Sequence, residues 1–170
     1  MGKPVFLVGY MGSGKTTTGK KLARNIGYFF FDLDEEIEKL TGKTLPQIFS
    51  TEGEEAFRLL EHSVLVSLSN RKNIVIATGG GAPCYFNNME LMKKSGVTVY
   101  FKMSPESLAK RLLVARVKRP LIEGIPAVEL PAFIAGHLSK REDYYSSAHI
   151  TIKGENLDLD HLTHAVREYL

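Results

Sequence analysis

The sequence predicts an α/β fold, a three-layer α/β/α arrangement in which helices cover both faces of a parallel sheet. Short, continuous apolar runs such as PVFLV at 4–8 and VTVYF at 97–101 are typical of strands buried on both faces. Such runs alternate with helical segments, as parallel strands joined by helical crossovers require. The 170 residues fit one domain, 1–170.

The first part of the chain contains two of the expected strands and two of the expected helices. The apolar run at 4–8 is followed by a glycine-rich turn and by a helical segment that ends at Gly27. The run YFFF at 28–31 indicates a second buried strand. A short helix is expected over 34–40, and Gly42 stops it.

Helix signals then continue up to a third strand. Thr44 followed by Gln47 is the pattern of a capping box at a helix start. A longer helix is predicted over 54–70, because its apolar residues recur along one stripe. That stripe consists of Phe57, Leu60, Val64 and Leu68. The run NIVIAT at 73–78 indicates the third strand, and three glycines follow it.

The second half of the chain continues the alternation. A helix over 89–94 leads to the strand at 97–101, and Ser104 with Pro105 opens the next helix as N-cap and first residue. From 115 to 130 the periodicity weakens, and prolines and glycines indicate a mobile lid. The last expected elements are a helix over 133–145, a strand over 148–152 and a helix over 158–170.

Composition excludes several classes of protein. Lys and Arg number 22 against 19 Asp and Glu, and the formal charge of +3 is too small for a nucleic-acid binder or a polybasic membrane binder. No apolar run approaches the roughly 20 residues of a membrane helix. The one cysteine, Cys84, cannot form an internal disulfide or a cysteine-based zinc site. With a lone thiol and no export signal, we expect a cytoplasmic protein.

A phosphate-binding loop is the strongest functional motif. The segment GYMGSGKT at 9–16 fits G-x-x-x-x-G-K-[ST], whose glycines let backbone N–H groups cradle phosphate oxygens. Lys15 would reach the β- and γ-phosphates, and the Thr16 hydroxyl would bind Mg²⁺. The alternative is an ordinary glycine-rich turn with an exposed lysine. A strand before the motif and a helix after it favour the phosphate loop.

A pair of carboxylates ends the second predicted strand. Strand alternation would place Asp32 and Asp34 on the same face. One could hold Mg²⁺ through water, and the other could accept a proton or a hydrogen bond from a substrate hydroxyl. The alternative is that Asp34 merely caps the next helix. Because this turn, the phosphate loop and the glycines at 79–81 all follow parallel strands, we expect them to converge on one crevice.

Several arginines could hold an anion. Arg58 lies one turn before Glu61, which could orient its guanidinium, and Arg141 lies in a late helix. The planar fork of arginine suits a carboxylate, and a lid arginine can close over transferring phosphate. The candidate lid residues are Arg111, Arg116, Lys118 and Arg119. Taken singly, each of these residues could equally be a solvated surface cation.

Taken together and in this order, the motifs resemble those of shikimate kinase over essentially the full chain. GYMGSGKT at 9–16 is similar to the family's phosphate loop, FDLD at 31–34 to its D-x-D element and FRLLE at 57–61 to its F-R-x-x-E element. Three further segments resemble motifs of the family, namely GGG at 79–81, KRPL at 118–121 and REDYY at 141–145.

The resemblance implies a nucleoside-monophosphate-kinase-like fold with five parallel strands in the order 2-3-1-4-5. It implies a lid over roughly 112–127 and substrate-binding helices over roughly 34–60. The implied reaction transfers the ATP γ-phosphate to the 3-hydroxyl of shikimate, in the biosynthesis of chorismate and aromatic amino acids. Mg²⁺ would be the cofactor, and shikimate and ATP the small-molecule partners of a monomer that binds neither nucleic acid nor membrane.

Carried onto this chain, the resemblance also assigns roles to residues. The catalytic residues would be Lys15, Asp34 and Arg119. Nucleotide would be bound by Gly12, Ser13, Gly14, Lys15, Thr16, Thr17, Arg111 and Arg119. Shikimate would be bound by Asp34, Arg58, Gly80 and Arg141, and the metal by Thr16 and, through water, by Asp32. The loop at 153–158 departs from the family pattern near the adenine, where Arg111 and Arg116 are both candidates.

Two other functions fit part of this pattern. A kinase for another small polyol acid, such as gluconate, would share the phosphate loop, although twin arginines with an acidic strand end suit a carboxylated polyol such as shikimate. A nucleotide-binding switch would also share the loop. Guanine specificity usually needs an N-K-x-D element, however, and the sequence contains none.

Overall fold

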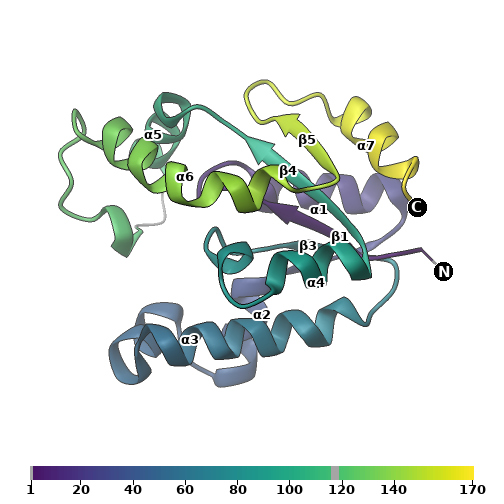
Figure 1. Cartoon of the computed structure of the whole chain (residues 1–170), viewed down its shortest axis with the longest axis horizontal. Coiled ribbons are helices and arrows are strands. Elements are labelled where there is room, and N and C mark those ends of the chain that lie inside the picture. The colour runs from purple at the N-terminus through teal and green to yellow at the C-terminus, as the bar shows by residue number, and fades with distance from the viewer. Residues whose placement is uncertain (1, 116–118) are drawn as a thin grey trace.

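The computed structural model describes residues 2–115 and 119–170, and within them five parallel strands form a sheet (Figure 1). The strands are β1 (Val5–Val8), β2 (Phe29–Asp32), β3 (Ile74–Ala77), β4 (Val97–Lys102) and β5 (Ile150–Lys153). Their order is β2-β3-β1-β4-β5, and every neighbouring pair is parallel. The predicted parallel α/β sheet and its strand order are confirmed.

Helices connect these strands as the alternating pattern predicts. They are α1 (Lys15–Ile26), α2 (Leu33–Thr41), α3 (Leu45–Ser69), α4 (Asn88–Ser95), α5 (Pro105–Val114), α6 (Leu130–Ser146) and α7 (Leu159–Arg167). Two short 3₁₀ helices, η1 (Ala82–Cys84) and η2 (Pro120–Ile122), were not predicted. Among the described residues, no helix combines the length and the apolar content that crossing a membrane requires.

Two hydrophobic cores lie on the two faces of the sheet. In β1, Val5 and Leu7 point into one core and Phe6 and Val8 into the other, and all four are fully buried. Helices α1 and α7 cover the first face, whereas α2 to α6 contribute to the core on the second face. Strand alternation therefore divides the apolar runs between two helical layers, which explains why the central strands carry no polar face.

One expectation about burial is wrong. The run at 28–31 was predicted as a strand buried on both faces, but β2 is an edge strand and Phe29 is 74% exposed. The partly buried Phe30 packs toward the α1 layer, and the partly buried Phe31 toward the other layer. An apolar run does not by itself distinguish a central strand from an edge strand, because that depends on the strand order.

Helix α3 combines two segments that were predicted separately. The capping box at its start is present: Thr44 accepts from the Gln47 backbone N–H, and the Gln47 side chain accepts from the Thr44 N–H. The helix bends at Gly53, whose φ of 85° and ψ of 173° are not helical. Glycine adopts this backbone conformation without the steric cost that a Cβ imposes. The bend divides α3 into a short first segment and the predicted long helix.

The carboxyl ends of the strands are flanked by two helical regions. Figure 1 shows α3 along one side of this edge and the α5–α6 pair, with the segment that joins them, along the other. The expected lid over 112–127 overlaps the last turn of α5 and extends into that joining segment, which contains η2. Two of the candidate lid residues, Arg116 and Lys118, lie outside the described residues.

Candidate active site

The glycine-rich loop between β1 and α1 forms an anion site at a helix N-terminus. Gly9, Gly12 and Gly14 have φ values of 143°, 80° and 94°, and Gly14 is the N-cap of α1. No side chain caps this end of the helix, so its first N–H groups remain available to an anion. Ser13 is buried in the loop. Thr17 is exposed on the first turn of α1.

Lys15 is buried inside this loop. Its Nζ donates hydrogen bonds to the Gly9 carbonyl at 2.7 Å and to the Tyr10 carbonyl at 3.0 Å. Burial lowers the pKa of Lys15 to about 8, an effect that the nearby Asp34 carboxylate partly opposes. A lysine held beneath a ring of backbone N–H groups is suited to contacting phosphate oxygens on the inner side of the loop.

The Thr16 hydroxyl and the Asp32 carboxylate lie side by side. Thr16 Oγ1 donates to Asp32 Oδ2 at 2.8 Å, and Asp32 Oδ1 accepts from the backbone N–H of Asp34 at 3.0 Å. Hydroxyl and carboxylate oxygens are ligands that Mg²⁺ prefers, with waters and substrate phosphates completing its shell. Among the described residues, no group of three or more histidine, cysteine, aspartate or glutamate side chains could hold a metal ion.

The acidic pair is arranged differently from the prediction. Asp34 does not share a strand face with Asp32, because α2 already begins at Leu33. Asp32, rather than Asp34, is the N-cap of α2 and accepts from the N–H groups of Asp34 and Glu35. Helical rather than strand geometry therefore orients the Asp34 side chain. Strand alternation could not reveal this, since the helix N-cap coincides with the last residue of β2.

Asp34 lies in a desolvated position beside other charges. Its pKa is raised to about 6, mainly by burial and also by the Asp32 carboxylate, against the opposing charges of Lys15 and Arg119. A carboxyl group with a pKa near 6 is ionised at neutral pH and is a stronger base than an ordinary aspartate. The position therefore suits a group that orients a hydroxyl or accepts its proton.

The triple glycine after β3 lies against four charged side chains. A Cβ on Gly79 would lie 3.1 Å from Glu61 Oε2 and 3.2 Å from Asp34 Oδ1. A Cβ on Gly80 would lie 3.2 Å from Arg141 Nη1, and one on Gly81 would lie 2.7 Å from Arg58 Nη2. Close approach, not backbone freedom, is what requires glycine here, because none of the three has a positive φ. The sequence predicted that this turn and Asp34 would lie at one crevice, and the glycines admit Asp34 and three other charged side chains.

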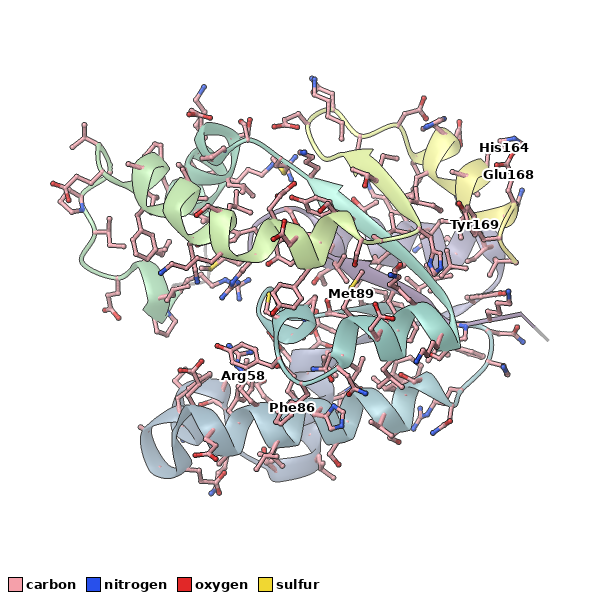
Figure 2. The ribbon with its side chains drawn as sticks, viewed as in Figure 1. Arg58, Phe86, Met89, His164, Glu168 and Tyr169 are labelled. Atoms are coloured by element: carbon pink, nitrogen blue, oxygen red, sulfur yellow. The ribbon has the colours of Figure 1, made fainter. Side chains whose placement is uncertain are left out.

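Arg58 projects from α3 toward this turn (Figure 2). Its Nη1 donates to Glu61 Oε1 at 2.9 Å, as the spacing of the two residues predicted, and Glu61 is only 1% exposed. Burial raises the pKa of Glu61 to about 7, and the Arg58 charge opposes that rise. The Arg58 Nε is buried and has no hydrogen-bond partner among the described residues. Glu61 thus fixes the guanidinium, and 12% of the Arg58 side-chain surface remains exposed.

Helix α6 brings two further groups to the glycine turn. Arg141 Nη1 approaches Gly80, and the Arg141 guanidinium carbon lies 5.7 Å from the ring centroid of Tyr10. One turn later, the buried Tyr145 donates a hydrogen bond from its hydroxyl to the Gly80 carbonyl. Because the two residues lie four positions apart on one helix, the arginine is placed beside Gly80 and the tyrosine hydroxyl anchors the Gly80 carbonyl.

Arg111 and Arg119 lie near the phosphate loop. Arg111 Nη2 donates to the Gly154 carbonyl at 3.2 Å, and its Nη1 would lie 3.1 Å from a Cβ on Gly14. Arg111 therefore joins the phosphate loop to the loop after β5, which is the position of the predicted adenine contact. Arg119 is exposed, and its charge lowers the pKa values of both Lys15 and Asp34. The competing candidate, Arg116, lies outside the described residues.

Sequence reasoning missed one residue that contacts the site. The ring centroid of Tyr85 lies 4.0 Å from the Arg58 guanidinium carbon. Tyr85 directly follows η1, and a single aromatic residue after an unpredicted 3₁₀ helix carries no periodic signal. Three histidines are hydrogen-bonded to other side chains, in the pairs His62–Asn88, His137–Tyr10 and His149–Thr98.

The fold and the site together define a P-loop kinase: a glycine-rich loop at a helix N-terminus on a parallel sheet of this order, with two carboxylates and two arginines gathered at the neighbouring glycine turn. The family model described as shikimate kinase matches residues 11–169. The shikimate kinase of Parabacteroides distasonis is 51% identical over 155 residues, which cover 91% of this chain and 90% of that protein. This chain belongs to the shikimate kinase family.

Solved structures agree with this assignment. The crystal structure of shikimate kinase from Bacteroides thetaiotaomicron has a TM-score of 0.91 and 39% identity, and the match covers 98% of this chain and 97% of that one. Shikimate kinase from Acinetobacter baumannii, solved in complex with shikimate, has a TM-score of 0.87 and 37% identity. That match covers 99% of this chain and 92% of the other.

Proposed function

We propose that this chain is a shikimate kinase, which transfers the γ-phosphate of ATP to the 3-hydroxyl of shikimate in the biosynthesis of aromatic amino acids. The observation that carries the proposal is the placement of Asp34, Arg58 and Arg141 against the glycines at 79–81, next to the phosphate loop. Two cations and one carboxylate around a turn suit an acceptor that has both a carboxylate and hydroxyl groups. The family relative solved with shikimate supports the same acceptor.

The acceptor would be held by groups from three elements. Arg58 and Arg141 would bind its carboxylate, and Gly80 would contribute a backbone N–H. Asp34 would accept hydrogen bonds from its ring hydroxyls. The buried Glu61 supports this assignment, because it fixes the Arg58 guanidinium at 2.9 Å and leaves Nε without a protein partner among the described residues.

The donor would be bound by the phosphate loop and α1. Gly12, Ser13 and Gly14 would surround the phosphates with backbone N–H groups, and Lys15 would contact the β- and γ-phosphates. The neighbouring nucleotide contacts would come from Thr16, Thr17, Arg111 and Arg119. The hydrogen bond from Arg111 to the Gly154 carbonyl supports an adenine position beside this pair.

The proposal includes Mg²⁺ held with the nucleotide. Thr16 would ligate the ion and Asp32 would bind it through water, consistent with their oxygens lying 2.8 Å apart. When bound, the ion neutralises charge on the β- and γ-phosphates and helps to hold them in line with the acceptor.

The protein's share of catalysis is positioning and charge stabilisation. Phosphoryl transfer passes through a loose transition state, so aligning the acceptor hydroxyl and stabilising the equatorial oxygens supply most of the rate. Lys15 and Arg119 would stabilise that charge. Asp34 would orient the 3-hydroxyl and take its proton as the new bond forms, since a secondary alcohol is too weak an acid to ionise beforehand. Closure of a lid over 112–127 would exclude water and suppress hydrolysis of ATP.

The first test is ADP release from MgATP with and without shikimate, with gluconate and quinate as control acceptors. Strong stimulation by shikimate alone is expected. Stimulation by gluconate instead would keep the phosphate loop and overturn the acceptor assignment, and nucleotide binding without any acceptor-dependent turnover would indicate a switch.

We further propose a cytoplasmic monomer formed by one domain over 1–170, consistent with the lone thiol of Cys84. Size-exclusion chromatography with light scattering tests the oligomeric state.

A further inference from the structure

Arg58 has an aromatic contact in addition to its ion pair. The Tyr85 ring centroid lies 4.0 Å from Arg58 Cζ, well inside the ~6 Å range of a cation–π interaction. We propose that Tyr85 is a positioning residue: its ring fixes the plane of the Arg58 guanidinium so that the remaining donors face the acceptor's carboxylate. This inference rests on the proposed function, because it concerns how that acceptor is bound.

The Tyr85 side chain is itself held in place by α3. Its hydroxyl donates to Glu54 Oε1 at 2.9 Å. Glu54 lies one turn before Arg58 and approaches the guanidinium only weakly, with 3.5 Å between Glu54 Oε1 and Arg58 Nη2. Glu54 therefore bonds at short distance to the tyrosine rather than to the arginine, which ties the ring to the helix that carries Arg58.

The backbone after Tyr85 supports this placement. Phe86 has a φ of 51°, a left-handed conformation that is uncommon for a bulky residue. Its ring lies 5.1 Å from that of His62, and His62 Nδ1 is 2.6 Å from Oδ1 of the buried Asn88. Figure 2 shows Arg58 and Phe86 between α3 and the segment that leads into α4. The strained turn is thus docked along α3, with Tyr85 over Arg58.

The contacts of α3 with this turn repeat every four residues. Glu54, Arg58 and His62 meet Tyr85 and Phe86 along one face of the helix. Such a continuous interface gives Tyr85 a defined position rather than that of a free surface ring. Phe86 provides an internal comparison, because it makes an equivalent aromatic contact with a residue that has no part in the proposed site.

The arrangement leaves 12% of the Arg58 side-chain surface exposed. Glu61 takes Nη1 at 2.9 Å, and the Gly81 backbone packs so closely that a Cβ there would lie 2.7 Å from Nη2. Nε has no partner among the described residues. With its face against the Tyr85 ring and one edge on Glu61, the guanidinium has little rotational freedom left to lose. Binding of a carboxylate should therefore be tighter, since the donor is already oriented.

A graded series of ring substitutions tests the electrostatic part of this idea, with Tyr85→Phe as the reference because every member of the series lacks the hydroxyl that donates to Glu54. Tyr85 is replaced by phenylalanine and by phenylalanines carrying one, two and three ring fluorines, each of which weakens the negative face of the ring. The dissociation constant of shikimate, measured by calorimetry, is expected to rise stepwise across the fluorinated series, by about 3- to 20-fold in total for a cation–π contact of ordinary strength. Nucleotide affinity and kcat should change little.

Two controls separate positioning from general support of the fold. The same fluorinated series at Phe86 should leave shikimate affinity unchanged, because that ring meets His62 instead of an arginine. Tyr85→Leu should weaken shikimate binding in the wild-type background but have little further effect in Arg58→Ala, since coupled residues are not additive. The fluorinated variants retain the ring, so they keep the test intact where Tyr85→Leu fails to fold.

The outcomes distinguish this inference from the proposed function. A shikimate affinity that does not respond to fluorination at Tyr85, in a protein that binds and phosphorylates shikimate, overturns the positioning role alone. Equal losses from the Tyr85 and Phe86 series, or full additivity of Tyr85→Leu with Arg58→Ala, overturn it as well. Failure of the wild-type chain to bind shikimate overturns the proposed function, and the positioning role falls with it.

Discussion

The hydroxyl of Thr16 donates a hydrogen bond to Oδ2 of Asp32 at 2.8 Å, across residues that lie 16 positions apart in the chain. The other carboxylate oxygen of Asp32 caps α2 by accepting from the Asp34 N–H. One side chain thus joins the first turn of the helix after the phosphate loop to the start of the helix that carries Asp34. Asp32 therefore connects the proposed metal position with the proposed acceptor position.

Asp32→Asn should weaken metal use while keeping the fold. Asparagine is also a good N-cap, so α2 should persist, but the carboxylate charge is lost. We expect the Mg²⁺ concentration for half-maximal turnover to rise by about 10- to 100-fold. Losses of this size are typical when a residue that does not bind the metal directly but holds the metal's ligands is replaced. Thr16→Ser, which keeps the hydroxyl, is the matched control. An unchanged Mg²⁺ dependence in Asp32→Asn would contradict the assignment.

Asp34→Asn should lower kcat by about 10²- to 10⁴-fold, the range of a lost general base. Because the pKa of Asp34 is raised to about 6, the ionised form that accepts the proton is lost as the pH falls through that value. Wild-type kcat/KM for shikimate should therefore decline below pH 6, and this limb should disappear in Asp34→Asn. Near-normal turnover by the variant would rule out its role as base and orienting group.

Local signals predicted most of the fold and much of the site. The phosphate loop, the capping box at Thr44 and the Arg58–Glu61 spacing depend on neighbours within a few residues, and each is present. The exposure of Phe29 depends instead on the position of β2 at the sheet edge, which no local pattern encodes. The same limit applies to Tyr85, whose partner lies 27 positions earlier on another element.

The buried carboxyls should make stability depend on pH. Burial raises the pKa of Asp34 to about 6 and that of Glu61 to about 7, whereas unfolded carboxyl groups titrate near 4. Between about pH 4 and 7 the folded chain therefore binds more protons than the unfolded chain, and the free energy of unfolding falls as the pH rises. His137, whose pKa burial lowers, contributes with the opposite sign.

A comparison of variants isolates the carboxyl contribution. Thermal unfolding of the wild type and of Asp34→Asn is followed between pH 4.5 and 8. The variant should gain stability relative to the wild type as the pH rises through about 6, because it no longer has to bury a charge. Asp143→Asn, the same change at an exposed position on α6, should show no such effect. A difference between wild type and Asp34→Asn that is constant with pH would show that Asp34 titrates normally.

Arg58→Lys should raise the KM for shikimate with a smaller effect on kcat. Lysine keeps the charge but cannot present two parallel donors to a carboxylate, and it also loses the stacking contact with Tyr85. An increase of roughly 10- to 100-fold corresponds to the loss of a charge-assisted hydrogen bond. The KM for ATP should stay constant. Arg71→Lys is the matched control, since Arg71 lies over the Phe31 ring and outside the proposed site. Equal effects of the two substitutions would contradict the role of Arg58.

Gly81→Ala should impair acceptor binding more than it impairs the fold. The new Cβ would lie 2.7 Å from Nη2 and 2.8 Å from Nη1 of Arg58, so the guanidinium must move away from the position that Glu61 gives it. Gly136→Ala on α6 is the control: nothing lies within 4 Å of its Cβ, and the change should stabilise the helix by roughly 1 kcal/mol. Shikimate titrations of both variants, alongside ATP titrations, measure the difference. Unaltered shikimate affinity in Gly81→Ala would mean that the acceptor does not depend on the present position of Arg58.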